Sequence, residues 1–292
     1  MNSPVYPVSG SGLGLRRDFL DDAIAMANNY PEDSLGDWPV NFWEVAPENW
    51  MNIGGAFGKK FRQLTERDTF VCHGLSLSIG STDPLDVDFV KALKAFFKEH
   101  NIVYYSEHLS YCSDSGHMYD LMPIPFTEEA VRHVAGRIKQ VQDILEQRIA
   151  MENVSYYAAP GQEMDEIDFL KAVLEEADCD FHLDINNIYV NSINHSYDAA
   201  EFLSRIPAER IGYAHIAGHY VEAEDLRVDT HGADVIDPVW NLLDEAYKRY
   251  GVFPTLLERD FNIPSFDTLL KEVETIAAYQ KNNQNQANSI RA

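Results

Sequence analysis

Cysteine is scarce in this chain, which has only three in 292 residues. Cys72, Cys112 and Cys179 lie far apart, and no C-x-x-C pair occurs. An odd number of isolated thiols argues against a disulfide framework and against a thiolate zinc site. We therefore expect all three to be structural thiols.

Basic residues are also few, because 23 Lys and Arg stand against 47 Asp and Glu and give a formal net charge of −24. Such a surface repels the phosphate backbone, so it argues against nucleic-acid partners. It fits a metal site, a cationic or neutral substrate, or a basic partner. The alternative explanation is that the acidity serves only to keep the protein soluble.

Long hydrophobic runs are missing. No stretch approaches the roughly 18 apolar residues of a membrane helix, and the start "MNSPVYPVSGSG" has neither a basic segment nor an apolar run. The sequence predicts a cytoplasmic protein without a membrane partner.

The fold class follows from short apolar, β-rich runs that alternate with longer amphipathic segments. The expected strands are 12–16, 41–46, 69–74, 102–108, 148–153, 180–186, 211–216 and 254–260. Eight such units predict a single (β/α)8 TIM barrel over residues 1–280. An open doubly wound sheet is disfavoured because no G-x-G-x-x-G follows the first strand. We expect the polar segment 281–292 to be a frayed tail.

Metal-ligating residues stand at the ends of six consecutive expected strands. They are His73, His108, Glu152, Asp184, His215 and Glu258, and Asp229 and His231 lie in the long loop after the seventh strand. Because barrel enzymes carry their chemistry at the carboxyl ends of the strands, we expect these side chains to meet there. Val71, Ala150 and Leu256 should lie beneath them on the inner face.

A ring of imidazoles and carboxylates with few Lys or Arg residues is mutually repulsive unless cations neutralise it. A carboxylate from the middle of the ring can bridge two ions about 3.5 to 4 Å apart. Mixed His and carboxylate ligands suit iron, manganese or zinc, and the residues alone do not choose among them. His182 should lie one layer deeper, where it either supports the ligands or packs. His219 is open among ligand, proton donor and structural roles.

Several ordered motifs carry a family resemblance from about Leu13 to Tyr279. They are "EVAPENW", "HGLSLSIGS", "SEHLSY", "DLMPIPFTEEA", "MENVSYY", "LDINNIYVN", "HIAGH", "DTHG" and "LLERDFNIP". Together they resemble the DUF692 (UPF0276) family of multinuclear non-heme iron oxygenases, within the xylose-isomerase-like barrels.

The resemblance implies two or three irons in mixed Fe(II)/Fe(III) states, with dioxygen as co-substrate. It adds Asn187 to the expected ligands, as a neutral and weaker one. It also implies a cysteine-containing, ribosomally made precursor peptide as substrate and a small leader-binding partner protein. Glu48 and His219 are expected near the chemistry, and Asn49 and Arg259 are expected to contact substrate.

Other functions stay open at this point. A hydrolase of the endonuclease IV type is disfavoured by the charge, because no basic cluster occurs beyond "GKKFRQ". A sugar isomerase or epimerase of the same barrel group differs in metal preference and needs no dioxygen. A non-catalytic metal-binding protein is the third possibility.

Overall fold

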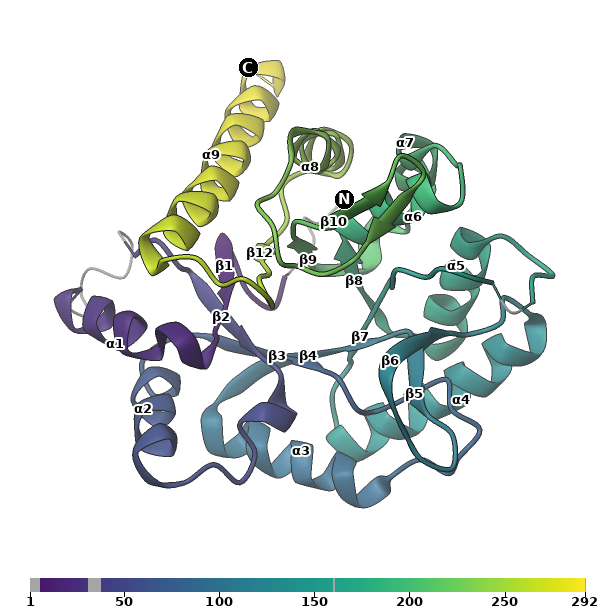
Figure 1. Cartoon of the computed structure of the whole chain (residues 1–292), viewed down its shortest axis with the longest axis horizontal. Coiled ribbons are helices and arrows are strands. Elements are labelled where there is room, and N and C mark those ends of the chain that lie inside the picture. Colours follow the sequence, from purple (N-terminus) through teal and green to yellow (C-terminus); the bar gives the residue numbers. More distant parts are fainter. Residues whose placement is uncertain (1–5, 31–37, 160, 292) are drawn as a thin grey trace.

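The protein forms a closed parallel barrel, seen here in a computed structural model that describes residues 6–30, 38–159 and 161–291 (Figure 1). In barrel order the strands are β1 Ser11–Gly14, β12 Thr255–Leu257, β9 Ile211–Ile216, β8 Asp180–Asp184, β7 Ala150–Glu152, β4 Ile102–His108, β3 Phe70–Gly74 and β2 Phe42–Val45. The predicted barrel is confirmed, and each predicted strand overlaps the observed one.

Helices surround the barrel as an outer layer (Figure 1). They are α1 Leu20–Asn29, α2 Gly55–Thr65, α3 Val87–His100, α4 Glu128–Leu145, α5 Glu166–Ala177, α6 Ile185–Asn194, α7 Ala199–Ser204, α8 Asp237–Tyr250 and α9 Phe266–Arg291, with 3-10 turns at Arg17–Phe19, Pro47–Asn49 and Ala208–Arg210. Thr127 caps α4 by accepting a hydrogen bond from the Ala130 N–H.

The segment expected to fray is helical instead, because α9 continues through Arg291. Two polar side chains at the start of this segment and just before it attach α9 to the rest of the molecule. Gln280 donates to the carbonyls of Gly10 and Phe253, and Asn283 donates to Asp244. Asn283 is buried, but the other residues of 281–289 are exposed, so this end of the helix is solvated over most of its length.

The barrel interior is packed below the mouth. Val71, Ala150 and Leu256 belong to one buried cluster with Phe42 and Tyr213. This agrees with the predicted inner layer beneath the strand-end residues. Cys72 points the other way, into the large core between strands and helices, and all three cysteines are buried free thiols. Strand alternation therefore fixes which side chains can reach the mouth.

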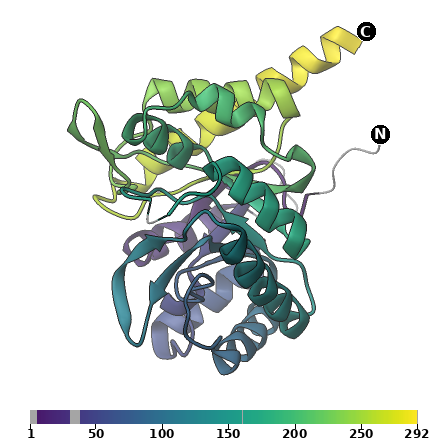
Figure 2. The same cartoon turned by 90° about the vertical axis from the view of Figure 1, so that its right-hand side faces the viewer.

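Two β-hairpins interrupt the alternation of strands and helices. They are β5 Ser110–Ser113 with β6 His117–Pro123, and β10 Tyr220–Ala223 with β11 Leu226–Val228. Both follow barrel strands at their carboxyl ends and project from the same side of the molecule (Figure 2). Among the described residues, no helix is long and apolar enough to cross a membrane.

Glu166 at the start of α5 gives a testable pH dependence away from the barrel mouth. Burial raises the pKa of its carboxyl group to about 7, although Tyr156 and Asn191 donate hydrogen bonds to it. A carboxyl group with a raised folded-state pKa stabilises the fold at low pH and loses that contribution as pH rises through the folded pKa.

We expect the free energy of unfolding of the Glu166→Gln variant to depend less on pH than that of the wild type. The glutamine stays neutral, so its advantage should grow from about pH 5 to pH 8 and reach about 2 kcal/mol after solvent screening. Urea unfolding at several pH values measures this difference. A difference that stays constant across this range would contradict the assignment.

Candidate metal centre at the barrel mouth

Glu152 and two histidines form the first part of the site. Glu152 Oε2 lies 3.2 Å from Nε2 of His73 and 3.2 Å from Nε2 of His108. The two Nε2 atoms are 3.1 Å apart. Three side chains from β3, β4 and β7 thus converge on one point, as the inward positions of neighbouring parallel strands require.

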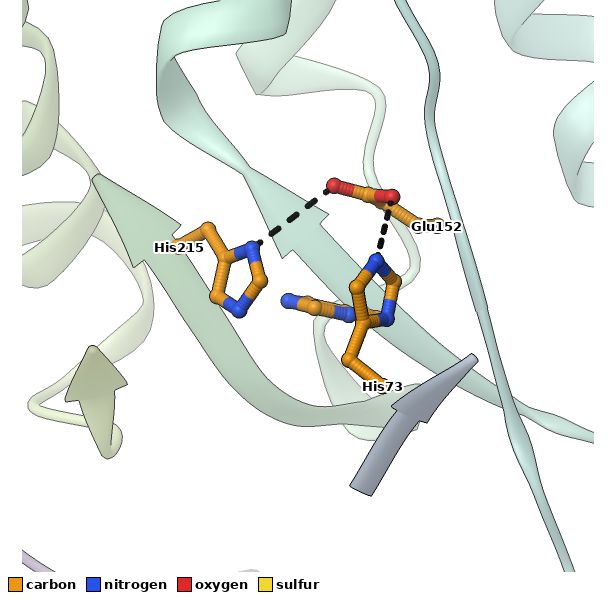
Figure 3. A group of neighbouring side chains, drawn as sticks. His73, Glu152 and His215 are labelled. Atoms are coloured by element: carbon orange, nitrogen blue, oxygen red, sulfur yellow. Dashed lines mark ion pairs between the residues drawn. The ribbon is translucent and has the colours of Figure 1, made fainter. Parts of the chain in front are cut away.

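His215 at the end of β9 lies between Glu152 and a second group of carboxylates, Asp184 and Glu258. Its Nδ1 lies 3.8 Å from Glu152 Oε1, 3.9 Å from Asp184 Oδ2 and 2.9 Å from Glu258 Oε2. Figure 3 shows His215 and His73 on opposite sides of the Glu152 carboxylate. The imidazole is fully buried.

The loop after β11 closes the ring. His231 Nε2 lies 2.7 Å from Asp229 Oδ1, and its Nδ1 lies 3.2 Å from Glu258 Oε2. The backbone of His231 has a positive φ of 48°. A left-handed conformation is uncommon for histidine and is typical of residues held in place at functional sites.

Three sets of possible ligand atoms each lie within 4.8 Å of one another. The sets are His73, Glu152, His182 and His215; Glu44, His215 and Glu258; and Asp184, His231 and Glu258. His215 and Glu258 each belong to two sets, so neighbouring ions could share them. Glu44 was not predicted, and His182 was expected to support the ligands or to pack beneath them.

The buried polar atoms of this ring fit a metal centre. Atoms without a hydrogen-bond partner include Glu152 Oε2, Asp184 Oδ2, Asn187 Oδ1, His182 Nε2, His215 Nδ1 and His231 Nε2. An unsatisfied buried polar group costs about 1–3 kcal/mol. Cations bound among these lone pairs would remove the cost, and imidazole with carboxylate ligands suits divalent transition metals.

A hydrogen-bond network beneath the ring sets the histidine tautomers. Tyr213 donates to Glu44 Oε2 at 2.5 Å, so the Ser106 hydroxyl, 2.7 Å away, donates to Tyr213. Ser106 must then accept from Nδ1 of His73 at 2.8 Å and of His182 at 3.1 Å. Both rings therefore carry the proton on Nδ1 and turn the Nε2 lone pair toward the centre.

His215 is oriented the opposite way by the same carboxylate. Its Nε2 lies 2.9 Å from Glu44 Oε2, so Nε2 keeps a proton, and loss of the Nδ1 proton to a bound cation would turn the Nδ1 lone pair toward Glu258 and Asp184. Glu44 is thus the final acceptor of two hydrogen-bond paths. It holds the orientation of His215 whether or not it also binds an ion.

Electrostatics within the ring also favour cations. Burial and the nearby Glu152 charge raise the pKa of Asp184 well above its usual value. Burial opposes ionisation of Glu258 as well, yet the His215 and His231 charges hold its pKa well below the usual range. A bound cation favours the ionised form of Asp184, because it supplies the missing positive charge.

Asp260 and Arg16 support His231 from outside the ring. Asp260 Oδ2 lies 3.0 Å from His231 Nδ1, and Arg16 Nε donates to Asp260 Oδ1 at 3.1 Å. The Arg16 guanidinium also lies 3.6 Å from Glu258 Oε1. Because Asp260 accepts the hydrogen bond from Nδ1, the other ring nitrogen of His231, Nε2, can face a metal, as at many histidine ligands with an outer carboxylate.

We expect Asp260→Asn to weaken metal binding by about 10- to 100-fold, because His231 would lose the carboxylate that fixes its tautomer. Competition with a chelator, read as metal per chain, measures this change. Asp237→Asn, at the exposed start of α8, is the matched control. Equal metal retention by both variants would show that Asp260 has no such role.

The structure brings eight of the nine predicted ligands into one continuous chain of neighbouring side chains. They are His73, His108, Glu152, Asp184, His215, Asp229, His231 and Glu258. Asn187, the ninth, is buried one helical turn from Asp184, whose carboxylate caps α6 by accepting a hydrogen bond from the Asn187 backbone N–H. Its amide nitrogen donates to the Asn153 carbonyl at 3.1 Å, which leaves Oδ1 free.

The four other predicted residues occupy different positions. His219 is buried, with Nδ1 2.8 Å from Asn186 Oδ1 and Nε2 unpartnered. Glu48 accepts hydrogen bonds from the backbone N–H groups of Leu75 and Ser76. It therefore holds the loop after β3.

Asn49 is exposed in the 3-10 turn after β2. Arg259 is not brought to the mouth. It is buried in ion pairs with Asp234 at 2.7 Å and Glu272 at 3.1 Å, because the inward position of the adjacent Glu258 turns it outward. The predicted substrate contact of Arg259 is therefore replaced by a structural one.

Solved structures with a similar fold include an L-ribulose 3-epimerase, with a TM-score of 0.61 and 13% identity over 100% of this chain and 99% of that one. A xylose isomerase domain protein from Alicyclobacillus acidocaldarius has a TM-score of 0.56 and 13% identity, covering 93% and 100%. These likenesses place the barrel among the xylose-isomerase-like folds and show the fold alone.

Relatives found by sequence are much more similar to this chain. A UPF0276 protein from Shewanella amazonensis is 62% identical and covers 92% of this chain and 94% of its own. One from Alcanivorax borkumensis is 60% identical, covering 94% and 92%. The model of the family described as "RiPP precursor modification enzyme MbnB/TglH/ChrH" matches residues 10–281. This chain therefore belongs to the MbnB/TglH/ChrH family of RiPP precursor modification enzymes.

Proposed function

We propose that this protein is a multinuclear iron oxygenase that oxidises cysteine in a ribosomally made precursor peptide. The observation that carries the proposal is the buried ring of imidazole and carboxylate atoms without hydrogen-bond partners, in a member of a peptide-modifying family. Iron ions bound there would supply Lewis acidity and electrons for the reduction of dioxygen.

The protein's own residues define how such ions would be held. His73, His108 and Glu152 face one position, while Asp184, His231 and Glu258 face another. Glu152 and His215 lie between them. Asn187 would contribute only a neutral oxygen, so the ion beside it would be held less tightly and could keep a position open for substrate.

His219 is the proposed proton acceptor for the substrate thiol. Burial and the Arg227 charge lower the pKa of its imidazole, so the ring is neutral near pH 7. Its Nδ1 faces Asn186, whose amide also donates to Asp229 at 2.9 Å. The unpartnered Nε2 is therefore a fixed, neutral base beside the metal ligands.

Metal analysis is the first test. Protein expressed in iron-rich medium and purified without dioxygen should contain two or three irons per chain, in line with the three sets of ligand atoms. Mössbauer spectra should show coupled or mixed-valence ions. Zinc or manganese alone would contradict the iron proposal and would favour a hydrolase or isomerase.

Co-expression tests the reaction itself. A short, cysteine-containing open reading frame encoded beside this gene would be expressed with the protein and with any small neighbouring partner protein. We expect a mass change at cysteine that requires dioxygen and is absent with the Glu152→Gln variant. An unchanged peptide mass in the presence of iron-loaded protein, partner and dioxygen would contradict cysteine oxidation.

A further inference from the structure

The β10–β11 hairpin has one protected edge and one open edge. On the protected side, the Asn194 side chain of α6 pairs with the backbone of Arg227 in β11. Asn194 Oδ1 accepts from the Arg227 N–H at 2.8 Å, and Asn194 Nδ2 donates to the Arg227 carbonyl at 2.9 Å. The Asn194 amide thus takes the place of a neighbouring strand.

The register then shows what β10 presents on its other side. Val221 lies opposite Arg227 in this antiparallel pair. Opposed residues either bond to each other through both backbone groups or turn both groups away. Since Arg227 directs its groups to Asn194, Val221 must direct its N–H and C=O to the outer edge of β10.

This outer edge is free of other strands in the described part of the chain, where the hairpin is a two-stranded sheet. All four residues of β10 are exposed. Tyr220 and Val221 are exposed by 56% and 54% although both are large and apolar. An open edge with exposed apolar side chains is a template for an added strand.

The hairpin is attached to the metal centre at both ends. His219 immediately precedes β10, and Asp229 immediately follows β11. The hairpin projects from the side of the barrel mouth (Figure 2). Other large exposed apolar residues lie in loops at the same end of the barrel, including Leu75, Tyr157 and Phe261. A strand added to β10 would therefore pass close to the site.

The charge of the hairpin indicates the chemistry of its partner. Glu222, Glu224 and Asp225 are exposed, and none forms an ion pair with another described residue. The nearby Arg227 guanidinium is occupied by the carbonyls of Ala223 and Glu224. With a chain charge of −24, this edge attracts a basic segment.

We propose that the outer edge of β10 binds an extended, lysine- or arginine-rich segment of the precursor peptide as an added antiparallel or parallel strand. The proposal rests on the proposed function for its peptide partner, and adds where and through which backbone groups the peptide docks. The Val221 N–H and C=O supply the main-chain hydrogen bonds, and the three acidic residues select the charge.

Two fluorescein-labelled peptides of equal length test the charge preference. Each has a central cysteine flanked by valine and threonine, and one is lysine-rich while the other is glutamate-rich. Fluorescence anisotropy without dioxygen should show that the lysine-rich peptide binds at least about tenfold more tightly. The combined Glu222→Gln, Glu224→Gln and Asp225→Asn variant should abolish this preference.

Two substitutions at one position test the backbone contact. Val221→Pro removes the outward N–H, whereas Val221→Ala keeps it and removes most of the apolar side chain. We expect binding of the lysine-rich peptide to fall at least about tenfold further in the proline variant than in the alanine variant. Amide exchange at Val221 should also slow when this peptide binds to the wild type.

Four results would overturn the β10 proposal. They are no binding at about 1 mM peptide, equal binding by both Val221 variants, equal binding of both peptides, or protection of the Val221 amide only by a separate partner protein. Because binding is measured without dioxygen, it is separable from the proposed reaction. If the protein contains iron but binds the peptide without the β10 edge, this inference alone is overturned. If the protein binds the peptide through β10 but does not take up iron, the iron proposal alone is overturned.

Discussion

Glu152→Gln is expected to remove at least one metal ion per chain. Glu152 Oε2 lies 3.2 Å from Nε2 of both His73 and His108, and Oε1 faces His215 at 3.8 Å. An amide has one acceptor oxygen and no charge, so it cannot serve both directions. We expect metal affinity to fall by more than the roughly 10- to 100-fold that is typical of losing an outer partner of a ligand.

Metal per chain after dialysis against a chelator measures the loss. Glu163→Gln is the matched control, because Glu163 is exposed in the segment that follows the same strand. The melting temperature gives a second readout, since a ligand at 100 times its Kd stabilises a fold by about 2.7 kcal/mol. Unchanged metal content in Glu152→Gln would place the ions elsewhere.

The position of most ligands was predictable because strand geometry has a fixed period. Parallel strands in a closed barrel end at one face, and alternation selects every second side chain. His73, Glu152 and His215 stand at strand ends in the sequence and meet in the structure. Asp229 and His231 were predicted from their motif, and only the folded loop shows that His231 contacts Glu258.

Glu44 was not predicted because it lies within the second strand, one residue before its end, and not at the strand end or in the loop that follows. The structure ends β2 at Val45, and Glu44 faces inward beside Gly14 of β1 and Val71 of β3. A signal was present, since a glutamate inside the apolar run "NFWEVA" must find a buried partner. Asp260 and Arg16 carried no comparable signal, because their contact joins residues 244 apart in the sequence.

Glu44→Gln is the second substitution with a large expected effect. The Glu44 carboxylate accepts from Tyr213 at 2.5 Å and from His215 Nε2 at 2.9 Å, and all three side chains are buried. Both donors reach the same oxygen, Oε2, so a glutamine oxygen in that place could accept from both, but it would lack the negative charge that strengthens each bond. We expect the free energy of unfolding to fall by about 2 kcal/mol, because two buried hydrogen bonds to a charged oxygen become hydrogen bonds to a neutral one.

A double-mutant cycle separates this network from a general loss of packing. Tyr213→Phe removes one of the two donors, so the Glu44→Gln, Tyr213→Phe protein should lose less stability than the two single losses predict together. Urea unfolding of the four metal-free proteins gives the coupling, and metal per chain reports whether His215 keeps its orientation. Additive losses would mean that Glu44 does not hold Tyr213 and His215 through a shared acceptor. A coupling of about 1 kcal/mol or more would show that the tautomers of the metal-facing histidines are set from beneath the ring, before any ion binds.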